Sequence, residues 1–402
     1  MKTRVLLSAL VICLLLSGCQ NDTGNTEILD FTAEDEVQEA YADNRYRMVT
    51  AMSFQEAENY FCGSSLTGNY LYYFDKACGI SGVLCADPAC THDTSQCNAY
   101  IESGATLSYC GGKLFWIATD PNSTTMDAYL WESDQSGINR KKIMRLSYED
   151  ILFPLQPQQY VIHRGRLYIL GQTGVVQDGK SGQRITLLCA PLGDGNAFET
   201  LADEVFYKGV TPTLRFAGDH AYLALVLFPP EGPYDVTITR YHCQTGMAET
   251  VFREAEMVQK PGAVWVTQKG DLYLPTADEG NAVVWKLEGE KRTEVAAWTG
   301  HGLSTPKIMD GIAILTRRDN GSRTVSIKSL SGEDIYEGKL FPEKIAGLNA
   351  NPNELGLMFV GGDRGKLIVN LMQTGGTEIL DYTLMLDIPD NLKATILWDS
   401  RK

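Results

Sequence analysis

The chain has 402 residues, which is enough for one large or two medium-sized domains, and its 44% hydrophobic and 21% charged residues are typical of a globular protein. The formal net charge of −15 repels phosphate backbones, and no local cluster of lysine and arginine offsets it. Nucleic acid is therefore excluded as an expected partner.

The N-terminus has the pattern of a signal peptide. Lys2 and Arg4 precede an apolar run over residues 5–16, which is too short to span a bilayer as a mature helix. A leucine, two small residues and Cys19 follow, and this arrangement is similar to the lipobox of bacterial lipoproteins. The resemblance implies removal of residues 1–18, a diacylglyceryl group on Cys19 and attachment to the outer side of a membrane. A plain secretory signal is the alternative.

Residues 19–45 are polar and acidic with few large apolar side chains, which predicts a disordered, solvated tether. No second apolar stretch is long enough to cross a bilayer. Because the acidic surface repels anionic headgroups, we expect membrane contact through the lipid alone. The expected location is extracytoplasmic, with the protein lipid-anchored to the cell membrane.

From residue 46 to 402 a unit recurs: a glycine turn followed by a short, alternating, aromatic-rich strand. Clear copies lie at 112–116, 165–169 and 270–274, and weaker copies lie at 218–223, 311–315 and 355–360. The turns recur about every 40 to 53 residues, the period of four-stranded propeller blades. Hairpins accompany these units, and we place them at 70–85, 128–146, 185–201, 236–252, 282–296, 324–340 and 366–380.

Seven hairpins predict an all-β fold, a seven-bladed β-propeller. Six or eight blades remain alternatives because the first and last units are degenerate, and a β-sandwich is the alternative architecture. Residues 394–398 form a predicted strand without a blade of its own. We expect this strand to close the ring as the innermost strand of blade one.

One segment concentrates three thiols and an imidazole: Cys85, Cys90, His92 and Cys97. These residues could supply a tetrahedral Cys₃His site for structural zinc, with Asp87 and Asp93 orienting the ligands. The spacing is not that of a zinc finger or a ferredoxin. A disulfide with one leftover thiol and a redox-active site are the alternatives, because so short and polar a loop needs a cross-link or a metal to stay ordered.

The segment 68–76, followed by the cysteine and histidine motif, looks like uncharacterised β-propeller lipoproteins of gut Firmicutes. The repeat is also similar to the TolB-like and low-density-lipoprotein-receptor-like propellers. The specific part covers about residues 62–100. The resemblance implies a surface-anchored propeller of unassigned activity and brings no catalytic residues. Further thiols fall into two groups: Cys62, Cys78 and Cys110 are open to an additional disulfide, and Cys189 and Cys243 are expected to be buried between blades.

The loops joining the two middle strands are long in blades two, three and four, at about 119–126, 173–184 and 227–235. We expect them to build a rim over the central funnel together with the cysteine and histidine segment. Phe228 and Tyr234 would be the ligand-binding apolar contacts of this rim. The alternative is that these are tolerated surface insertions.

Signals for catalysis are weak, since the sequence has no Gly-x-Ser-x-Gly, His-Glu-x-x-His or phosphate-loop motif. We assign no catalytic residue. The expected function is a membrane-anchored extracytoplasmic propeller that binds a protein, peptide or glycan. A propeller-fold carbohydrate-active enzyme using funnel carboxylates and a metal- or redox-sensing module are the alternatives.

Overall fold

The computed structural model describes residues 53–55, 60–65, 68–75, 80–101, 107–110, 113–119, 128–134, 136–146, 159–193, 198–229, 232–373 and 381–399. All of them belong to one compact unit. The strands account for the regular structure of these residues, and no helix that could cross a membrane occurs among them. Cys19, the predicted signal peptide and the predicted tether lie outside the described residues.

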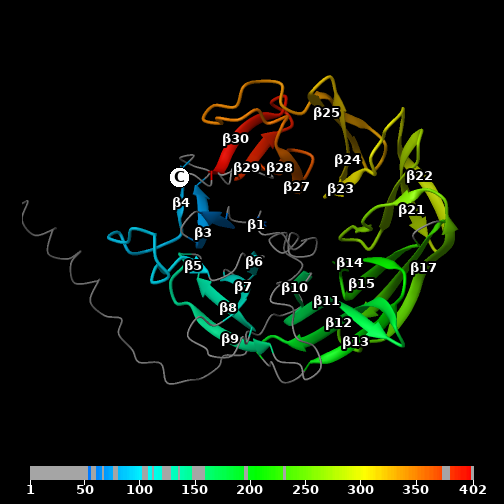
Figure 1. Ribbon diagram of the computed structural model, residues 1–402, viewed down its shortest axis with the longest axis horizontal. Helices are drawn as coiled ribbons and strands as arrows, with labels where there is room; N and C mark the ends of the chain where they lie inside the picture. Colours follow the sequence, from blue (N-terminus) through cyan, green and yellow to red (C-terminus); the bar gives the residue numbers. More distant parts are fainter. Residues whose placement is uncertain are drawn as a thin grey trace, which may run out of the picture. The chain divides into compact units, whose positions relative to one another are not determined.

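The strands form seven antiparallel sheets, each built from strands that are consecutive in the sequence. The sheets are arranged around a central axis as the blades of a propeller (Figure 1). The predicted all-β, seven-bladed β-propeller is confirmed.

Blades 1 to 4 come first along the chain. Blade 1 comprises β1 (Ser53–Gln55), β2 (Tyr60–Ser65), β3 (Gly68–Asp75), β4 (Ile80–Val83) and β5 (Tyr100–Ile101). Blade 2 comprises β6 (Leu107–Cys110), β7 (Lys113–Thr119), β8 (Ala128–Asp134) and β9 (Lys141–Leu146). Blade 3 comprises β10 (Gln159–His163), β11 (Arg166–Gln177), β12 (Lys180–Pro191) and β13 (Glu199–Phe206). Blade 4 comprises β14 (Gly209–Ala217), β15 (His220–Phe228), β16 (Tyr234–His242) and β17 (Ala248–Met257).

Blades 5 to 7 complete it. Blade 5 comprises β18 (Lys260–Pro261), β19 (Trp265–Val266), β20 (Leu272–Ala277), β21 (Asn281–Glu288) and β22 (Lys291–Thr299). Blade 6 comprises β23 (Lys307–Met309), β24 (Ile312–Asp319), β25 (Ser322–Ser329) and β26 (Asp334–Lys339). Blade 7 comprises β27 (Gly356–Gly362), β28 (Lys366–Met372), β29 (Asp381–Asp387) and β30 (Lys393–Asp399).

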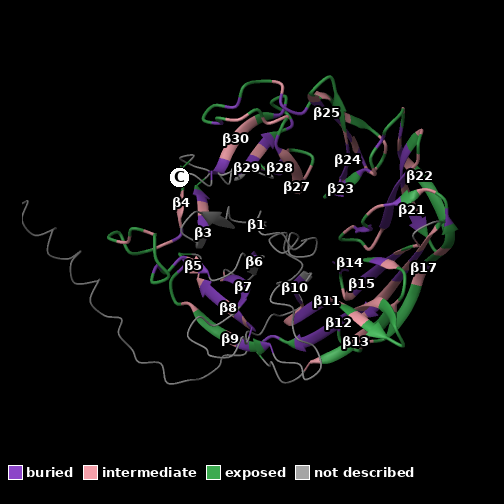
Figure 2. Cartoon of the chain, in the orientation of Figure 1, coloured by how far each residue is buried: buried purple, intermediate pink, exposed green. Residues whose placement is uncertain are grey.

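The core lies between neighbouring blades. Tyr168 of blade 3 and Phe216 of blade 4, for example, meet edge to face with ring centroids 4.8 Å apart. Because neighbouring blades cover both faces of a strand such as β20, all six of its residues are buried. Buried residues accordingly follow the second and third strands, whereas exposed residues follow outer strands such as β13 and β17 (Figure 2).

The glycine turns have a clear conformational basis. Gly165, Gly270 and Gly311 have φ values of 67°, 84° and 76°, a left-handed region that side chains with a Cβ adopt only with strain. Each of these glycines turns the chain from the innermost strand into the second strand of its blade. This explains why the motif marks blades 3, 5 and 6 in the sequence.

The predicted ring closure is wrong. β1 pairs with β2, so blade 1 has its own inner strand, and β30 pairs with β29 as the outer strand of blade 7. The error has a simple origin. The second strand of blade 7 is β28, which follows the turn at Gly365, whereas the weak copy at 355–360 belongs to the inner strand β27. The strands that the sequence predicts for blade 7 are therefore shifted by one position along the chain, and residues 394–398 have no blade in that prediction.

Candidate metal centre

The Cys/His loop, defined here as residues 84–99, leaves and rejoins the outer edge of β3. β4 pairs with one end of β3, and β5 pairs with the other end. Between them the backbone of Leu71 holds both ends of the loop: its carbonyl accepts from the Leu84 N–H at 2.8 Å and its N–H donates to the Ala99 carbonyl at 2.9 Å. Hydrogen bonds to one residue of blade 1 therefore hold the two ends of the loop together.

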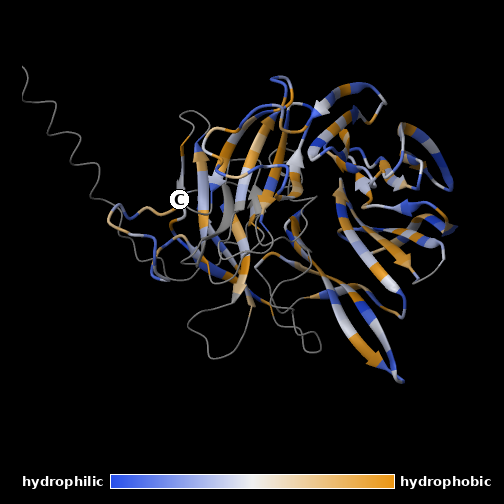
Figure 3. Ribbon diagram, turned by 45° about the horizontal axis from the view of Figure 1, so that its top comes forward, coloured by the Kyte–Doolittle hydropathy of each residue, from blue (hydrophilic) through white to orange (hydrophobic). Residues whose placement is uncertain are grey.

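The loop lies at the perimeter of the ring. It projects outward between β4 and β5, away from the central axis, in two views of the chain (Figures 1 and 3). Its neighbour is the outer hairpin of blade 2, where Gly137 stands against Leu84. The expected rim over the funnel is therefore wrong for this loop.

The interior of the loop consists of the predicted ligands. From Cys85 to Cys97 every residue is exposed except four, of which Cys97 is buried and the other three are partly buried. The four are Cys85, Cys90, His92 and Cys97. The thiols and the imidazole point inward, and between Cys85 and Cys97 the other apolar residues, which are alanines and a proline, are exposed.

The spacing of these groups fits a tetrahedral centre. Their ligand atoms all lie within 4.8 Å of one another, and His92 Nδ1 lies 3.4 Å from Cys97 Sγ. With Zn–S near 2.3 Å and Zn–N near 2.0 Å, the edges of a tetrahedron are about 3.8 Å between sulfurs and about 3.5 Å between sulfur and nitrogen. The donor set and its spacing therefore fit a metal such as zinc, which would draw the widest pair together by about 1 Å.

Two turns present Cys90 and Cys97. In the first turn the Cys90 N–H donates to the Asp87 carbonyl at 3.2 Å, and the Asp87 side chain accepts from the Ala89 N–H at 2.9 Å. Pro88 occupies the position of such a turn that favours proline. In the second turn the Cys97 N–H donates to the Thr94 carbonyl at 3.1 Å.

The acidic side chains of the loop shape its backbone. The Asp93 carboxylate accepts from the Thr91 hydroxyl at 2.6 Å, and the Asp87 carboxylate caps the turn described above. Asp87 thus stabilises the turn that presents Cys90, and Asp93 bonds the residue that precedes His92. His92 has a φ of 55°, a left-handed conformation in which histidine is enriched among side chains with a Cβ.

The thiols of the cluster differ in acidity. Burial disfavours the Cys85 thiolate, but hydrogen bonds from the Asp87 N–H and from the thiols of Cys97 and Cys90 outweigh it, so the pKa of Cys85 is lowered. Burial, reinforced by the Cys90 and Cys85 thiols, raises the pKa of Cys97 to about 12. The Ala99 N–H, which donates to Cys97 Sγ at 3.4 Å, opposes this rise. Such N–H···S contacts are favourable once a metal has made the sulfur a thiolate.

Arg140, in the turn between β8 and β9, is a cation beside the cluster, and sequence reasoning missed it. One guanidinium nitrogen donates to the carbonyls of Asn98 and Tyr100, each at 2.6 Å. The guanidinium carbon lies 4.8 Å from the Trp116 ring and 5.8 Å from the Trp131 ring. Among the described residues no carboxylate pairs with Arg140.

Burial lowers the pKa of Arg140 to about 10, and the nearby Cys97 opposes this shift. The side chain is therefore charged at neutral pH. A zinc ion held by three thiolates and a neutral imidazole would carry a net charge of −1, and Arg140 would supply the matching charge from blade 2. No motif in the sequence connects residue 140 with residue 97, because only the packing of two blades brings them together.

The predicted ligand-binding pair lies elsewhere. Phe228 ends β15, is 40% exposed, and its ring covers Gly209. Tyr234 begins β16 and packs against the buried cluster that contains Met257. The segment 173–184 is mostly strand, since β11 and β12 continue to a tight turn at Asp178 and Gly179. The structure does not join these residues to the Cys/His loop.

Two other cysteines and one other histidine pack in the core between blades. Cys189 and Cys243 are buried thiols outside any disulfide, in the cluster between blades 3 and 4, as predicted. His163 packs on Phe216 with ring centroids 4.9 Å apart. Cys78 and the loop at 120–127 lie outside the described residues, as do the side chains of Cys62 and Cys110.

Comparisons with known proteins identify the fold. No protein-family model and no curated protein matches the sequence. Among solved structures, the chain is similar to a prolyl endopeptidase (TM-score 0.52, 14% identity, 92% of this chain and 52% of that one). It is also similar to puromycin hydrolase (0.52, 15%, 90% and 55%) and to prolyl oligopeptidase B from Galerina marginata (0.51, 11%, 91% and 52%). The chain thus spans about half the length of these proteins, and at such identities the similarity shows a shared β-propeller fold alone.

Proposed function

We propose that this chain is a recognition propeller displayed outside the cell, held to a membrane by lipid on Cys19, and that its Cys/His loop binds one zinc ion. The ligand that it recognises is a protein, a peptide or a glycan. The propeller supports this role because it is a rigid scaffold whose loops and blade edges face solvent. The lipobox-like sequence around Cys19 supports the location.

The observation that carries the metal proposal is the composition of the loop interior. Among residues 85–97, the four that are not exposed are the three cysteines and the histidine whose ligand atoms converge. A segment that buries no aliphatic or aromatic side chain between Cys85 and Cys97 needs another source of order, and four-ligand zinc sites contribute folding free energy directly. Zinc with four protein ligands has no open position, so its role here is structural.

A second candidate function is redox sensing, favoured by the lowered pKa of Cys85 beside two further thiols. A thiolate at Cys85 is the nucleophile that thiol–disulfide exchange requires, and Cys90 or Cys97 would be its disulfide partner. An external disulfide would be the oxidant and would leave as two thiols.

One experiment separates these candidates. The full chain is purified in detergent without chelator, and zinc is measured by elemental mass spectrometry beside a thiol titration. We expect one zinc per chain, none in Cys90→Ser or His92→Ala, and one in the control variants Cys189→Ser and Cys243→Ser, whose thiols are buried elsewhere. A metal-free chain that contains a disulfide between two loop cysteines would contradict the zinc proposal and support redox sensing.

The anchor and the ligand need separate tests. Mass spectrometry of the N-terminus is expected to find a lipidated Cys19, and Cys19→Ala is expected to release the protein from membranes. An unmodified N-terminus would contradict the anchor. For recognition, a pull-down from the native cell envelope is expected to retain a specific partner, and failure to retain one would contradict the recognition role.

A further inference from the structure

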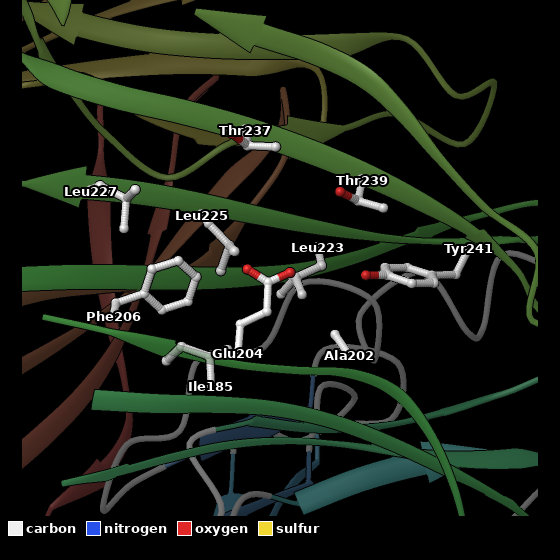
Figure 4. Close-up of a pocket in the computed structure, with 10 residues that line it drawn as sticks. All are labelled: Ile185, Ala202, Glu204, Phe206, Leu223, Leu225, Leu227, Thr237, Thr239 and Tyr241. Atoms are coloured by element: carbon white, nitrogen blue, oxygen red, sulfur yellow. The ribbon is translucent and has the colours of Figure 1, made fainter. Parts of the chain in front are cut away.

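A groove opens between blades 3 and 4 on the outer side of the ring. Its cavity of about 90 Å³ is bounded by β12 and β13 of blade 3 and by β15 and β16 of blade 4 (Figure 4). That volume equals about three water molecules and is far below the 300–1,000 Å³ of pockets for drug-sized ligands. The groove is therefore suited to a single side chain.

The walls of the groove are apolar on one part and polar on another. Leu223, Leu225 and Leu227 alternate along β15 and face blade 3, where Ile185 and Phe206 lie opposite them (Figure 4). Leu223 and Ile185 are buried, whereas the other three side chains remain partly accessible from the groove. The aliphatic part of an incoming side chain would replace water against these residues.

Glu204 is the charged residue of this lining. Its carboxylate extends between the two blades among the leucine side chains (Figure 4). Other acidic residues of the same strand are paired, since Asp203 bonds Arg184 and Glu199 bonds Arg166. Glu204 forms no ion pair or hydrogen bond within the part of the chain that the structure describes.

Two hydroxyl groups of β16 stand near this carboxylate. Thr239 and Tyr241 both line the groove. Burial raises the pKa of Tyr241, and the negative charge of Glu204 raises it further. The groove thus offers three oxygen acceptors and no cation.

We propose that this groove binds the side chain of a lysine on a protein partner, with its aliphatic stem against Leu223, Leu225 and Leu227 and its ammonium group on Glu204. The inference rests on the recognition role proposed above and names the chemistry of the partner. An ammonium group has three N–H donors, which match the oxygens of Glu204, Thr239 and Tyr241. The net charge of −15 on the whole chain also attracts a basic partner.

The test uses a phage-displayed library of random heptapeptides selected on the full chain in detergent. Selected peptides are resynthesised, and their affinities are measured against wild type, Glu204→Gln and Glu290→Gln. The last variant is the matched control, because Glu290 is an exposed acid in blade 5 and the substitution changes the net charge equally. Each peptide is also made with its lysine acetylated.

We expect the selected peptides to share a lysine. Their affinity should fall at least about tenfold on Glu204→Gln and on acetylation of that lysine, and should be unchanged on Glu290→Gln. Selected peptides without a common lysine, with arginine in its place, or with equal affinity for Glu204→Gln would overturn the groove proposal and leave the recognition role standing. An empty selection would also overturn the groove proposal, and the envelope pull-down then decides the recognition role separately.

Discussion

Tyr72 of blade 1 and Trp398 of blade 7 meet edge to face, with ring centroids 5.5 Å apart and ring planes at 62°. Both side chains are buried, although their strands β3 and β30 belong to different sheets. Leu71, Ile368 and Leu397 belong to the same buried cluster. The seam between the first and last blades is therefore held by side chains, without a strand shared between the two ends of the chain.

This seam predicts a large and specific loss of stability for Trp398→Ala. The free energy of unfolding should fall by about 3–5 kcal/mol, because a buried aromatic ring is removed and a cavity remains. A double-mutant cycle with Tyr72→Leu should give a coupling of about 0.5–1.5 kcal/mol, measured by urea denaturation. Trp298→Ala, in blade 5, should also destabilise the chain but show no coupling to Tyr72→Leu. A seam cycle without coupling would contradict a direct ring contact.

The position of Gly137, at the base of the Cys/His loop, leads to a second prediction, on stability and zinc affinity. Its φ is 75°, and a Cβ there would lie 2.6 Å from the Leu84 carbonyl oxygen, next to Cys85. Gly179 has the same φ of 75° but nothing within 4 Å. Gly179→Ala should therefore cost about 1–2 kcal/mol for the conformation alone. Gly137→Ala should cost more and should weaken zinc binding, as measured by urea denaturation and by competition with a chelator. Equal costs and unchanged zinc affinity would contradict the contact.

The position of Arg140 leads to a third prediction, because its charge would lie beside an anionic zinc centre. Arg140→Met should lower the zinc affinity at least about tenfold, the range found for groups that support metal ligands. Arg140→Lys should lie between Arg140→Met and wild type, since lysine keeps the charge but loses the planar guanidinium that lies over the Trp116 ring. The measurement is chelator competition, and Arg166→Gln, beside Cys189, is the control that should leave the zinc affinity unchanged. An affinity that does not respond to Arg140→Met would contradict the pairing of charges.

The repeat and the metal ligands could be predicted from the sequence because both are local signals. A glycine with positive φ marks the entry to the second strand at Gly165 and Gly270, although Gly179 and Gly321 show that the same conformation also precedes third strands. Cys85 and Cys97 are close in the chain, so their convergence needs only a closed loop. A local signal can also mislead. In the last blade the weak copy at 355–360 lies on the inner strand β27, whereas the second strand β28 follows the turn at Gly365.

Features that depend on two blades could not be predicted in this way. Arg140 reaches the carbonyl of Asn98 across 42 positions of sequence, and Glu204 meets Tyr241 across an interface between blades. Neither residue belongs to a motif. Their neighbours follow from how one sheet packs on the next, which depends on the twist and spacing of whole blades and leaves no pattern in either segment alone.

The acidity of the thiols predicts how zinc binding depends on pH. Zinc binds thiolates, so every thiol that is protonated in the metal-free chain must release its proton on binding. Cys97, with a pKa of about 12, holds its proton at pH 7, whereas the lowered pKa of Cys85 reduces its share of released protons. Binding should therefore release at least one proton. The affinity should fall about tenfold for each unit of decreasing pH per proton released.

Calorimetry of the chelator-treated full chain at pH 7, in buffers with different enthalpies of ionisation, measures this release directly. Cys97→Ser should lower the number of protons released as well as the affinity, because serine has no thiol proton to lose at this ligand position. Cys243→Ser, a buried thiol in the cluster between blades 3 and 4, should change neither quantity. Zinc binding to wild type without proton release would mean that the thiols are already ionised before the metal arrives. The burial of Cys97 in the metal-free loop would then not govern the chemistry of this centre.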